Sequence, residues 1–97
     1  MYAVVNRLTF ARPVDQQVVD LFAEEGIPRM REAGCLDARV VRGAPEQIVL
    51  VILFESAEQC DDVTARVGSP WMRERIVPLL AGPTERLTGP VVAAMGS

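Results

Sequence analysis

The stretch Ile48-Val49-Leu50-Val51-Ile52-Leu53-Phe54 decides the fold of this chain. All of its residues are apolar and most are β-branched or aromatic, so the segment has no polar face to present to water. It is much shorter than the roughly 20 apolar residues that span a bilayer. An apolar run of this length, between turn residues, is typical of a β-strand that is covered on both faces.

The residues before this strand predict a strand, a helix and a second strand. Residues 2–10 alternate in side-chain direction, and apolar residues in 14–25 recur at helical spacing. Gly26 and Pro28 then favour a break or kink, because proline lacks an amide proton and disfavours helical geometry in the preceding residue. Residues 36–42 mix charged and apolar side chains, which is typical of a strand at a sheet edge.

The residues after the central strand predict a second helix and a last strand. Ser56 with Gln59 three residues later forms a capping box, which begins a helix that reaches residue 67. The segment Gly68-Ser69-Pro70 restarts the helix, with the serine as cap and the proline at the first helical position. A second helical piece over 71–77 follows, and then a strand over 85–94.

The predicted order βαββαβ indicates an α+β, ferredoxin-like fold in one domain, residues 1–97. In that arrangement the first and third strands lie in the centre of a four-stranded sheet, which agrees with their apolar character. The charged second strand and the fourth strand, which contains Pro90, suit the edges. Both helices then cover one face of the sheet. The other face stays bare and apolar, so we expect a second subunit to cover it in a homodimer.

Composition excludes several classes of function. The net charge is −3, and all ten basic residues are arginines without a dense cluster, so nucleic acid is not an expected partner. The absence of histidine removes the commonest general base, metal ligand and haem ligand, and we expect no metal site. Cys35 and Cys60 are expected to be small buried residues and not a disulfide. With no leader and no long apolar span, we expect a cytoplasmic protein without a membrane partner.

Three short motifs carry a family resemblance. They are Asn6-Arg7-Leu8-Thr9 in the first strand, Gly34-Cys35-Leu36 before the second, and Phe54-Glu55-Ser56 at the second helix. With them, nearly the whole chain resembles the dimeric α+β barrel superfamily, in particular the antibiotic-biosynthesis-monooxygenase-like group. The resemblance implies fold and dimer more than reaction, since its members include cofactor-independent oxygenases of aromatic polyketides, haem-degrading enzymes and proteins of unknown role.

The haem-degrading branch of that resemblance fits this chain poorly. Its pattern implies an Asn in the first strand, which Asn6 matches, and a Trp in the second helix, where this chain has Val63. The only tryptophan is Trp71, and the usual histidine is missing. Haem binding is therefore the third choice among the functions that the resemblance implies.

Asn6 is the predicted catalytic residue, because an amide on an otherwise apolar strand face must find hydrogen-bond partners between sheet and helices. In a cofactor-independent oxygenase such a group donates to a phenolate or a developing enolate oxygen. The alternative is an asparagine tied to neighbouring backbone. Arg7 points to the opposite face, and we expect it to pair with Asp37 or Glu55.

The predicted substrate-binding residues form the lining of a small apolar pocket near Asn6. Trp71 has the size to form one wall and has an indole N–H that can reach a ligand. The other lining residues are Leu8, Phe22, Val63 and Met72. The alternative for all of them is ordinary packing in the core.

Two functions remain open at this point. The first is a cofactor-independent monooxygenase with an aromatic or polyketide-like substrate. The second is a non-catalytic dimeric module that binds a small hydrophobic metabolite, which the scarcity of titratable groups favours.

Overall fold

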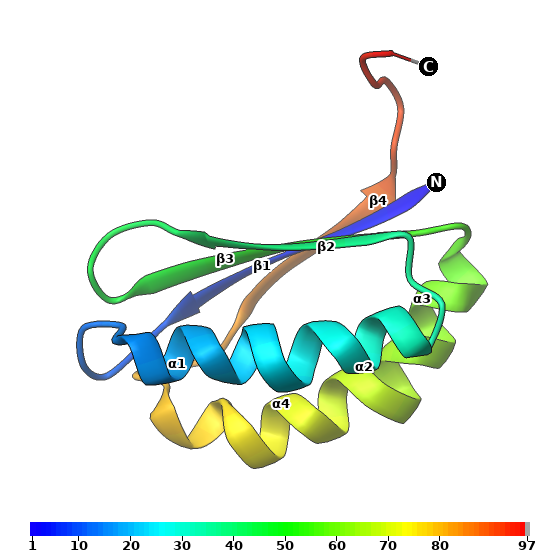
Figure 1. Ribbon diagram of the computed structural model, residues 1–97. Helices are drawn as coiled ribbons and strands as arrows, with labels where there is room; N and C mark the ends of the chain where they lie inside the picture. The colour runs from blue at the N-terminus through cyan, green and yellow to red at the C-terminus, as the bar shows by residue number, and fades with distance from the viewer. Residues whose placement is uncertain (97) are drawn as a thin grey trace.

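The computed structural model describes residues 1–96, so Ser97, the last residue of the predicted domain, lies outside it. The strands are β1 (Tyr2–Thr9), β2 (Asp37–Arg42), β3 (Gln47–Phe54) and β4 (Glu85–Pro90). They form one antiparallel sheet in the order β2-β3-β1-β4, and the helices lie against a single face of it (Figure 1). The predicted α+β ferredoxin-like fold is confirmed, with the first and third strands in the centre.

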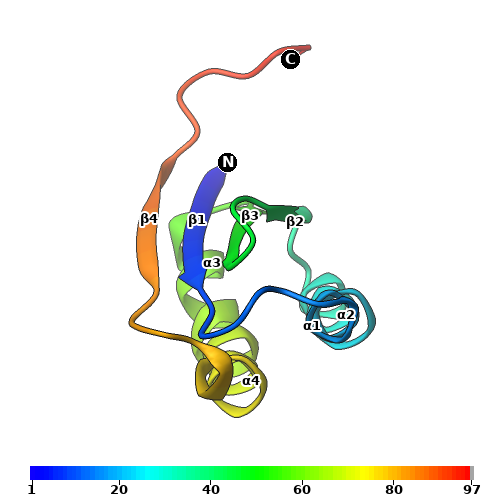
Figure 2. The same ribbon diagram turned by 90° about the vertical axis from the view of Figure 1, so that its left-hand side faces the viewer.

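The alternation along β3 separates the two faces of the sheet. Ile48, Leu50 and Phe54 are buried beneath the helices, whereas Val49 and Val51 point the other way and are only partly buried. The end view in Figure 2 shows the helices on one side of the strands and none on the other. We expected both faces of this strand to be covered. The chain itself covers one face with its helices and leaves the other uncovered.

Each predicted pair of helical pieces is one continuous helix. The first consists of α1 (Gln16–Leu21), a π-helical segment η1 (Phe22–Gly26) and α2 (Ile27–Glu32). The second consists of α3 (Ala57–Val63), the π-helical segment η2 (Thr64–Gly68) and α4 (Ser69–Arg75), and a short 3-10 turn, η3 (Val77–Leu79), follows. The expected breaks at Gly26 to Pro28 and at Gly68 to Pro70 are wrong.

Both helices continue because a wide π turn precedes each proline. The amide of Ile27 bonds to the carbonyl of Phe22, and the amide of Ser69 to that of Thr64, each five residues back. In a regular α-helix the ring of Pro28 or Pro70 would collide with the carbonyl four residues earlier. The wider turn makes room for the ring, so the helix continues past the proline.

The helix starts agree with the sequence in one case and differ in another. Ser56 accepts a hydrogen bond from the amide of Gln59 at 3.1 Å, as a capping box requires. The Gln59 side chain bonds to the amide of Glu55 and the carbonyl of Gly34 rather than back to Ser56. Ser69 is not a cap, because it has helical dihedral angles inside the continuous helix.

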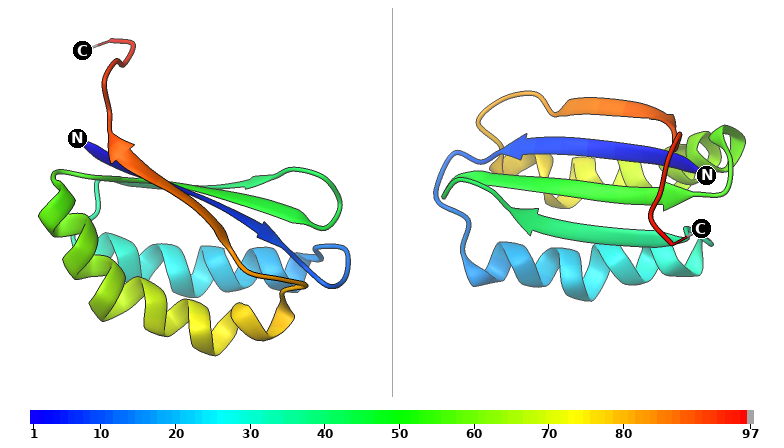
Figure 3. Two further views of the ribbon diagram at one scale, coloured as in Figure 1. Left: turned by 180° about the vertical axis from the view of Figure 1, so that it is seen from behind. Right: turned by 90° about the horizontal axis from the view of Figure 1, so that it is seen from above.

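The face of the sheet that no helix covers is apolar in its middle. The right panel of Figure 3 looks onto this face. Val5, Val49, Val51 and Leu53 form its centre, and Leu87 on β4 is 70% exposed. After β4, residues 91–96 rise from the sheet on this side (Figure 1).

Three smaller expectations have clear outcomes. Cys35 and Cys60 are free cysteines, as predicted, but only Cys60 is buried and Cys35 is partly exposed. Arg7 binds Glu85 on the neighbouring strand, so the expected pairing with Asp37 or Glu55 is wrong. Within residues 1–96, no helix is long and apolar enough to cross a membrane.

Candidate functional site

The hydrophobic core consists of two separate clusters. The larger one surrounds Leu8, Phe22 and Trp71, and the smaller one surrounds Phe54 and Val63. Asn6 stands on β1 between Val4, in the smaller cluster, and Leu8, in the larger one. A polar side chain on the core face thus marks the place where apolar packing is interrupted.

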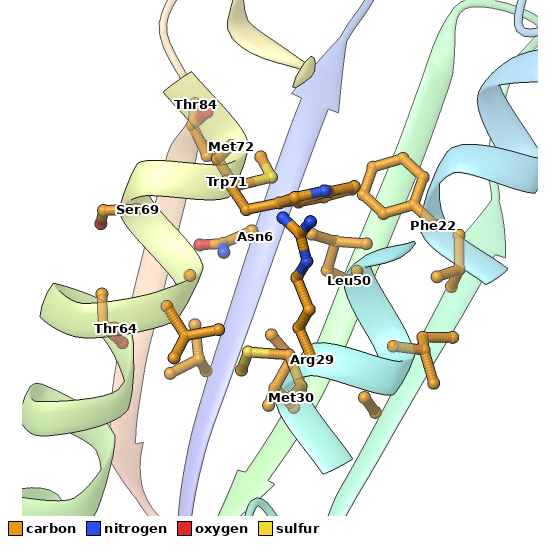
Figure 4. Close-up of a pocket in the computed structure, with 18 of the residues that line it drawn as sticks. Asn6, Phe22, Arg29, Met30, Leu50, Thr64, Ser69, Trp71, Met72 and Thr84 are labelled. Atoms are coloured by element: carbon orange, nitrogen blue, oxygen red, sulfur yellow. The ribbon is translucent and has the colours of Figure 1, made fainter. Parts of the chain in front are cut away.

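A cavity of about 710 Å³ lies at this interruption, between the sheet and the two helices. Its floor is the helix-facing side of the sheet, and its walls come from η1 with α2 and from η2 with α4 (Figure 4). A cavity of this size is in the range of small-molecule sites. The residues that line it are mostly apolar: Val4, Phe22, Ile27, Met30, Ala38, Val40, Leu50, Ile52, Phe54, Ala65, Val67, Trp71, Met72 and Val77.

Asn6 lies in the middle of the cavity floor. The strand register places it directly between Leu50 on β3 and Arg86 on β4, so the three side chains share the helix-facing side. Figure 4 shows the Asn6 amide projecting from β1 into the cavity. Its Oδ1 is buried and has no hydrogen-bond partner among the described residues. A buried polar atom without a partner is costly, and a ligand could remove that cost only if the Asn6 side chain turned Oδ1 toward the cavity.

Trp71 forms the wall opposite the floor and is held from two sides. Its ring packs edge-to-face on Phe22, with centroids 5.4 Å apart. It also lies against Gly26, where a Cβ atom would be only 2.9 Å from the indole ring. The indole Nε1–H donates to Glu25 at 3.1 Å. We expected this N–H to reach a ligand, but it binds within the protein instead.

Glu25, on the first helix, binds both Trp71 and Arg75 on the second helix. Both of its carboxylate oxygens accept hydrogen bonds from Arg75, at 3.1 and 3.0 Å. These bonds, together with the Trp71 N–H, hold the pKa of the Glu25 carboxyl below its usual value. The carboxylate is therefore charged at neutral pH and fixes the orientation of the indole ring.

The structure brings together four of the six predicted site residues. Asn6, Phe22, Trp71 and Met72 line the cavity. Leu8 and Val63 do not: Leu8 is completely buried and Val63 is 1% exposed, each packed inside one of the core clusters. Near Val63 the helix contributes Thr64 and Val67 to the wall instead.

Among the residues of the site that were not found from the sequence, Arg86 and Glu25 show why. Arg86 belongs to a strand whose register with β1 no local pattern specifies. Glu25 is one of the charged residues between the apolar positions of the first helix, which the pattern places in solvent, and only the approach of the two helices brings it to Trp71. Among the described residues, no group of three or more His, Cys, Asp or Glu side chains is placed to hold a metal ion.

Solved structures that resemble this one show the same fold. A monooxygenase from Streptomyces coelicolor, ActVA-Orf6 in complex with nanaomycin D, superimposes with a TM-score of 0.78 at 23% identity, over 99% of this chain and 92% of that one. SnoaB, a cofactor-independent oxygenase from Streptomyces nogalater, gives 0.78 at 15% identity over 99% and 97%. Rv0793 from Mycobacterium tuberculosis gives 0.75 at 18% identity over 97% of both chains.

The sequence itself defines the family. The profile described as "Antibiotic biosynthesis monooxygenase" matches residues 1–70. These residues include β1 to β3, the first helix, and the second helix up to the start of α4. The chain belongs to this family, as the resemblance implied. Among curated proteins, no sequence matches at a significant level.

Proposed function

We propose that this protein is a cofactor-independent monooxygenase that acts on an aromatic or polyketide-like substrate. The observation that carries the proposal is Asn6, a polar residue with a buried and unpartnered Oδ1, on the floor of a mostly apolar cavity. Membership of the family supports it, as does the likeness to a cofactor-independent oxygenase and to a monooxygenase solved in complex with nanaomycin D.

The cavity has the features that such a reaction requires of a protein. The apolar walls exclude water from the substrate and leave room for dioxygen. The substrate, as an enolate or phenolate, supplies the electrons that reduce dioxygen. Asn6 would orient the reacting ring and stabilise the developing negative oxygen through its amide. The rings of Trp71 and Phe22 provide contact area for an aromatic substrate.

We also propose that the working unit is a cytoplasmic homodimer. The uncovered sheet face carries Val5, Val49, Val51 and Leu53, and exposed Leu87 extends the apolar area to the edge strand. Isolated proteins seldom expose apolar areas of this extent, which mark interfaces. The two sheets would pack face to face with an obligate-type interface of above about 2,000 Å² in total.

Oxygen consumption is the direct test of the reaction. Purified protein is incubated with a panel of phenols and anthrones in air and under nitrogen, without flavin or added metal and with a chelator present. We expect product with at least one compound in air alone, unaffected by the chelator. Asn6→Ala should lower the rate, and Gln16→Ala, an exposed change on α1, serves as the matched control.

A non-catalytic binding module is the second candidate, and one observation favours it. No Asp, Glu or His lines the cavity among residues 1–96, so general acid and base groups that work near neutral pH are scarce there. If the protein binds phenols or anthrones of the panel but turns over none of them in air, the binding module is the better description.

Haem binding is the third candidate, and we expect the purified protein to be colourless. A chain without histidine, with Val63 where the haem-degrading branch has Trp, should bind haem weakly. In a visible absorption titration with haemin, a sharp Soret shift that saturates at one haem per subunit would contradict this prediction.

A further inference from the structure

A second hollow of about 430 Å³ lies between the two helices, and we call it the outer groove. Only helix residues line it, one turn apart on the sides of the helices that face each other. They are Arg29, Glu32, Ala33, Arg66, Val67, Pro70, Trp71 and Glu74. Three of them, Arg29, Val67 and Trp71, also line the inner cavity. The groove and the cavity are therefore separated by a single layer of side chains.

Polar contacts join the helices at two points, and the outer groove lies between them. At one end the carboxylate of Glu25 binds side chains of the second helix. At the other end the side chain of Gln59 on α3 donates to the carbonyl of Gly34, just after the first helix, at 3.0 Å. Between these points, no hydrogen bond or ion pair of the described part of the chain joins residues 27–33 to residues 60–70. The helices can therefore separate slightly here without the loss of a polar bond.

Arg29 is the long side chain that extends across this interval. It is exposed to solvent although it also lines the cavity, which places it at an opening. In Figure 4 it leaves α2 and extends toward the ring of Trp71. Its guanidinium has no hydrogen bond or ion pair within residues 1–96. An exposed side chain without a protein partner changes rotamer rapidly and at little cost.

The other arginines that line the cavity are each held by a hydrogen bond. Arg39 donates to a carboxylate at 2.9 Å, Arg73 to a backbone carbonyl at 3.4 Å and Arg86 to a thiol at 3.9 Å. Movement of any of these three side chains away from the cavity loses a bond, whereas rotation of Arg29 loses none. The wall is therefore easiest to open at Arg29.

We propose that ligands enter the cavity from the outer groove, between the two helices, and that Arg29 controls this entrance. With the guanidinium across the layer of side chains the cavity is closed, and with the guanidinium turned into solvent the cavity is continuous with the groove. Arg29 thus sets the rate at which ligands exchange. The inference rests on the proposed function, since it concerns access to the same cavity. It applies equally to a bound metabolite that is not turned over.

The exchange kinetics of a neutral aromatic probe test the proposal. The probe is N-phenylnaphthylamine, whose fluorescence is excited by energy transfer from Trp71, the only tryptophan of the chain. Stopped-flow mixing gives the association rate constant, and displacement by an excess of naphthol gives the dissociation rate constant. Both are measured under nitrogen, so that the result does not depend on turnover.

Two variants change the entrance in opposite directions. Arg29→Ala should raise both rate constants about 10-fold, because it lowers a barrier that entry and exit share. Ala33→Phe adds bulk in the outer groove, outside the cavity, and should lower both about 10-fold. The dissociation constant, the ratio of the two rate constants, should change by less than about 2-fold in each variant.

Matched controls carry the same substitutions on the same helix. Arg31→Ala and Ala23→Phe change exposed residues outside the cavity and the outer groove, so both rate constants should stay at the wild-type values. Thermal melting checks that all four variants are folded. If Ala33→Phe does not fold, Arg29→Ala with its control still decides the question.

The outcomes distinguish this proposal from the proposed function. Rate constants that do not respond to Arg29→Ala would overturn the entrance and leave the cavity and its proposed reaction intact. A change in the dissociation constant with only one rate constant affected would also overturn it, because the variant would then have altered a binding contact and not a barrier. Faster exchange in Arg73→Ala alone would place the entrance elsewhere in the wall. Exchange that depends on Arg29, without oxygen consumption, would support the entrance and reject the monooxygenase. If neither the probe nor any compound of the panel binds, both proposals fail.

Discussion

At the scale of single residues, Asn6 and Glu25 use the same kind of chemistry for different purposes. Asn6 lines the cavity and its Oδ1 is buried with no partner among the described residues, whereas every polar atom of the Glu25 carboxylate is bonded to Arg75 or Trp71. An unsatisfied buried group stores free energy that a ligand can recover, and a satisfied one fixes its neighbours. The first is therefore expected to act in binding and the second in shaping the wall.

We expect Asn6→Ala to separate binding from stability. Because Oδ1 accepts from no donor within the described residues, truncation leaves no protein donor without its partner, and the melting temperature should change little. Ligand affinity or turnover should fall about 10 to 100-fold, the worth of one or two hydrogen bonds. If Asn6 is instead a structural tie, stability should fall by about 1–3 kcal/mol with affinity unchanged. Melting temperature and affinity are measured on the same preparation.

Glu25→Gln should change how stability depends on pH. The folded-state pKa of this carboxyl lies below its usual 4.5, so its stabilisation is present above that value and is lost as the pH falls through the folded pKa. Wild type should therefore be more stable than the variant at about pH 6, and the difference should shrink at about pH 3. Thermal melts at both values measure it. Glu24→Gln, one residue away, is the control, and an unchanged difference at low pH would contradict the prediction.

At the scale of elements, the two π-helical segments position the site. η1 ends at Gly26, and η2 is followed within one turn by Trp71, so the wider turns bring the indole ring directly over the glycine. π-helical turns inside α-helices occur often at functional sites. Here they let two proline-containing helices continue without a break along the cavity and approach each other at the point where its wall forms.

Gly26→Ala should disturb that wall, and Gly68→Ala should not. A Cβ at Gly26 would lie 2.9 Å from Trp71, which forces the ring to move and costs about 1–3 kcal/mol. At Gly68 the nearest atom is a backbone oxygen at 4.0 Å, and alanine in a helix should stabilise by about 0.5–1 kcal/mol. Unfolding in urea gives both values, and tryptophan fluorescence reports the ring. Equal effects of the two changes would show that the close approach is unimportant.

At the scale of the whole molecule, the two faces of the sheet have different roles. Its helix-facing side forms the cavity floor with Asn6, Arg86 and the apolar residues around them. Its other side is an apolar surface with ion pairs at two corners, Arg7 with Glu85 and Arg39 with Asp37. A second copy of the chain would cover the apolar centre, and the corner charges discourage other registers of association.

Val51→Asp tests the proposed dimer. Val51 lies in the centre of the uncovered face and is only partly buried within one chain, so the charge is expensive chiefly when a partner covers it. We expect wild type to sediment as a dimer at micromolar concentration and the variant to dissociate and lose stability. Ala23→Asp, on the exposed side of the first helix, is the matched control. A stable 10.6 kDa monomer of wild type would contradict the proposal.

Much of the fold was readable in local patterns. Ile48 to Phe54 indicated a central strand, and the charged and proline-containing strands indicated the edges, because burial and pairing act on each strand through its own side chains. The continuity of the two helices could not be predicted from the sequence. Proline signals a break in an α-helix, and whether a π turn accommodates the ring instead depends on packing against the neighbouring helix.

The sequence by itself determined the strand order, the capping of α3 by Ser56 and the presence of one polar residue, Asn6, on an apolar strand face. Only the tertiary structure decided which residues share the cavity with it. Arg86 is 80 positions away from Asn6 in the numbering and reaches it through strand register, and Glu25 reaches Trp71 through the approach of two helices. Local periodicity fixes which face a side chain takes, whereas contacts between distant elements depend on how those elements pack together.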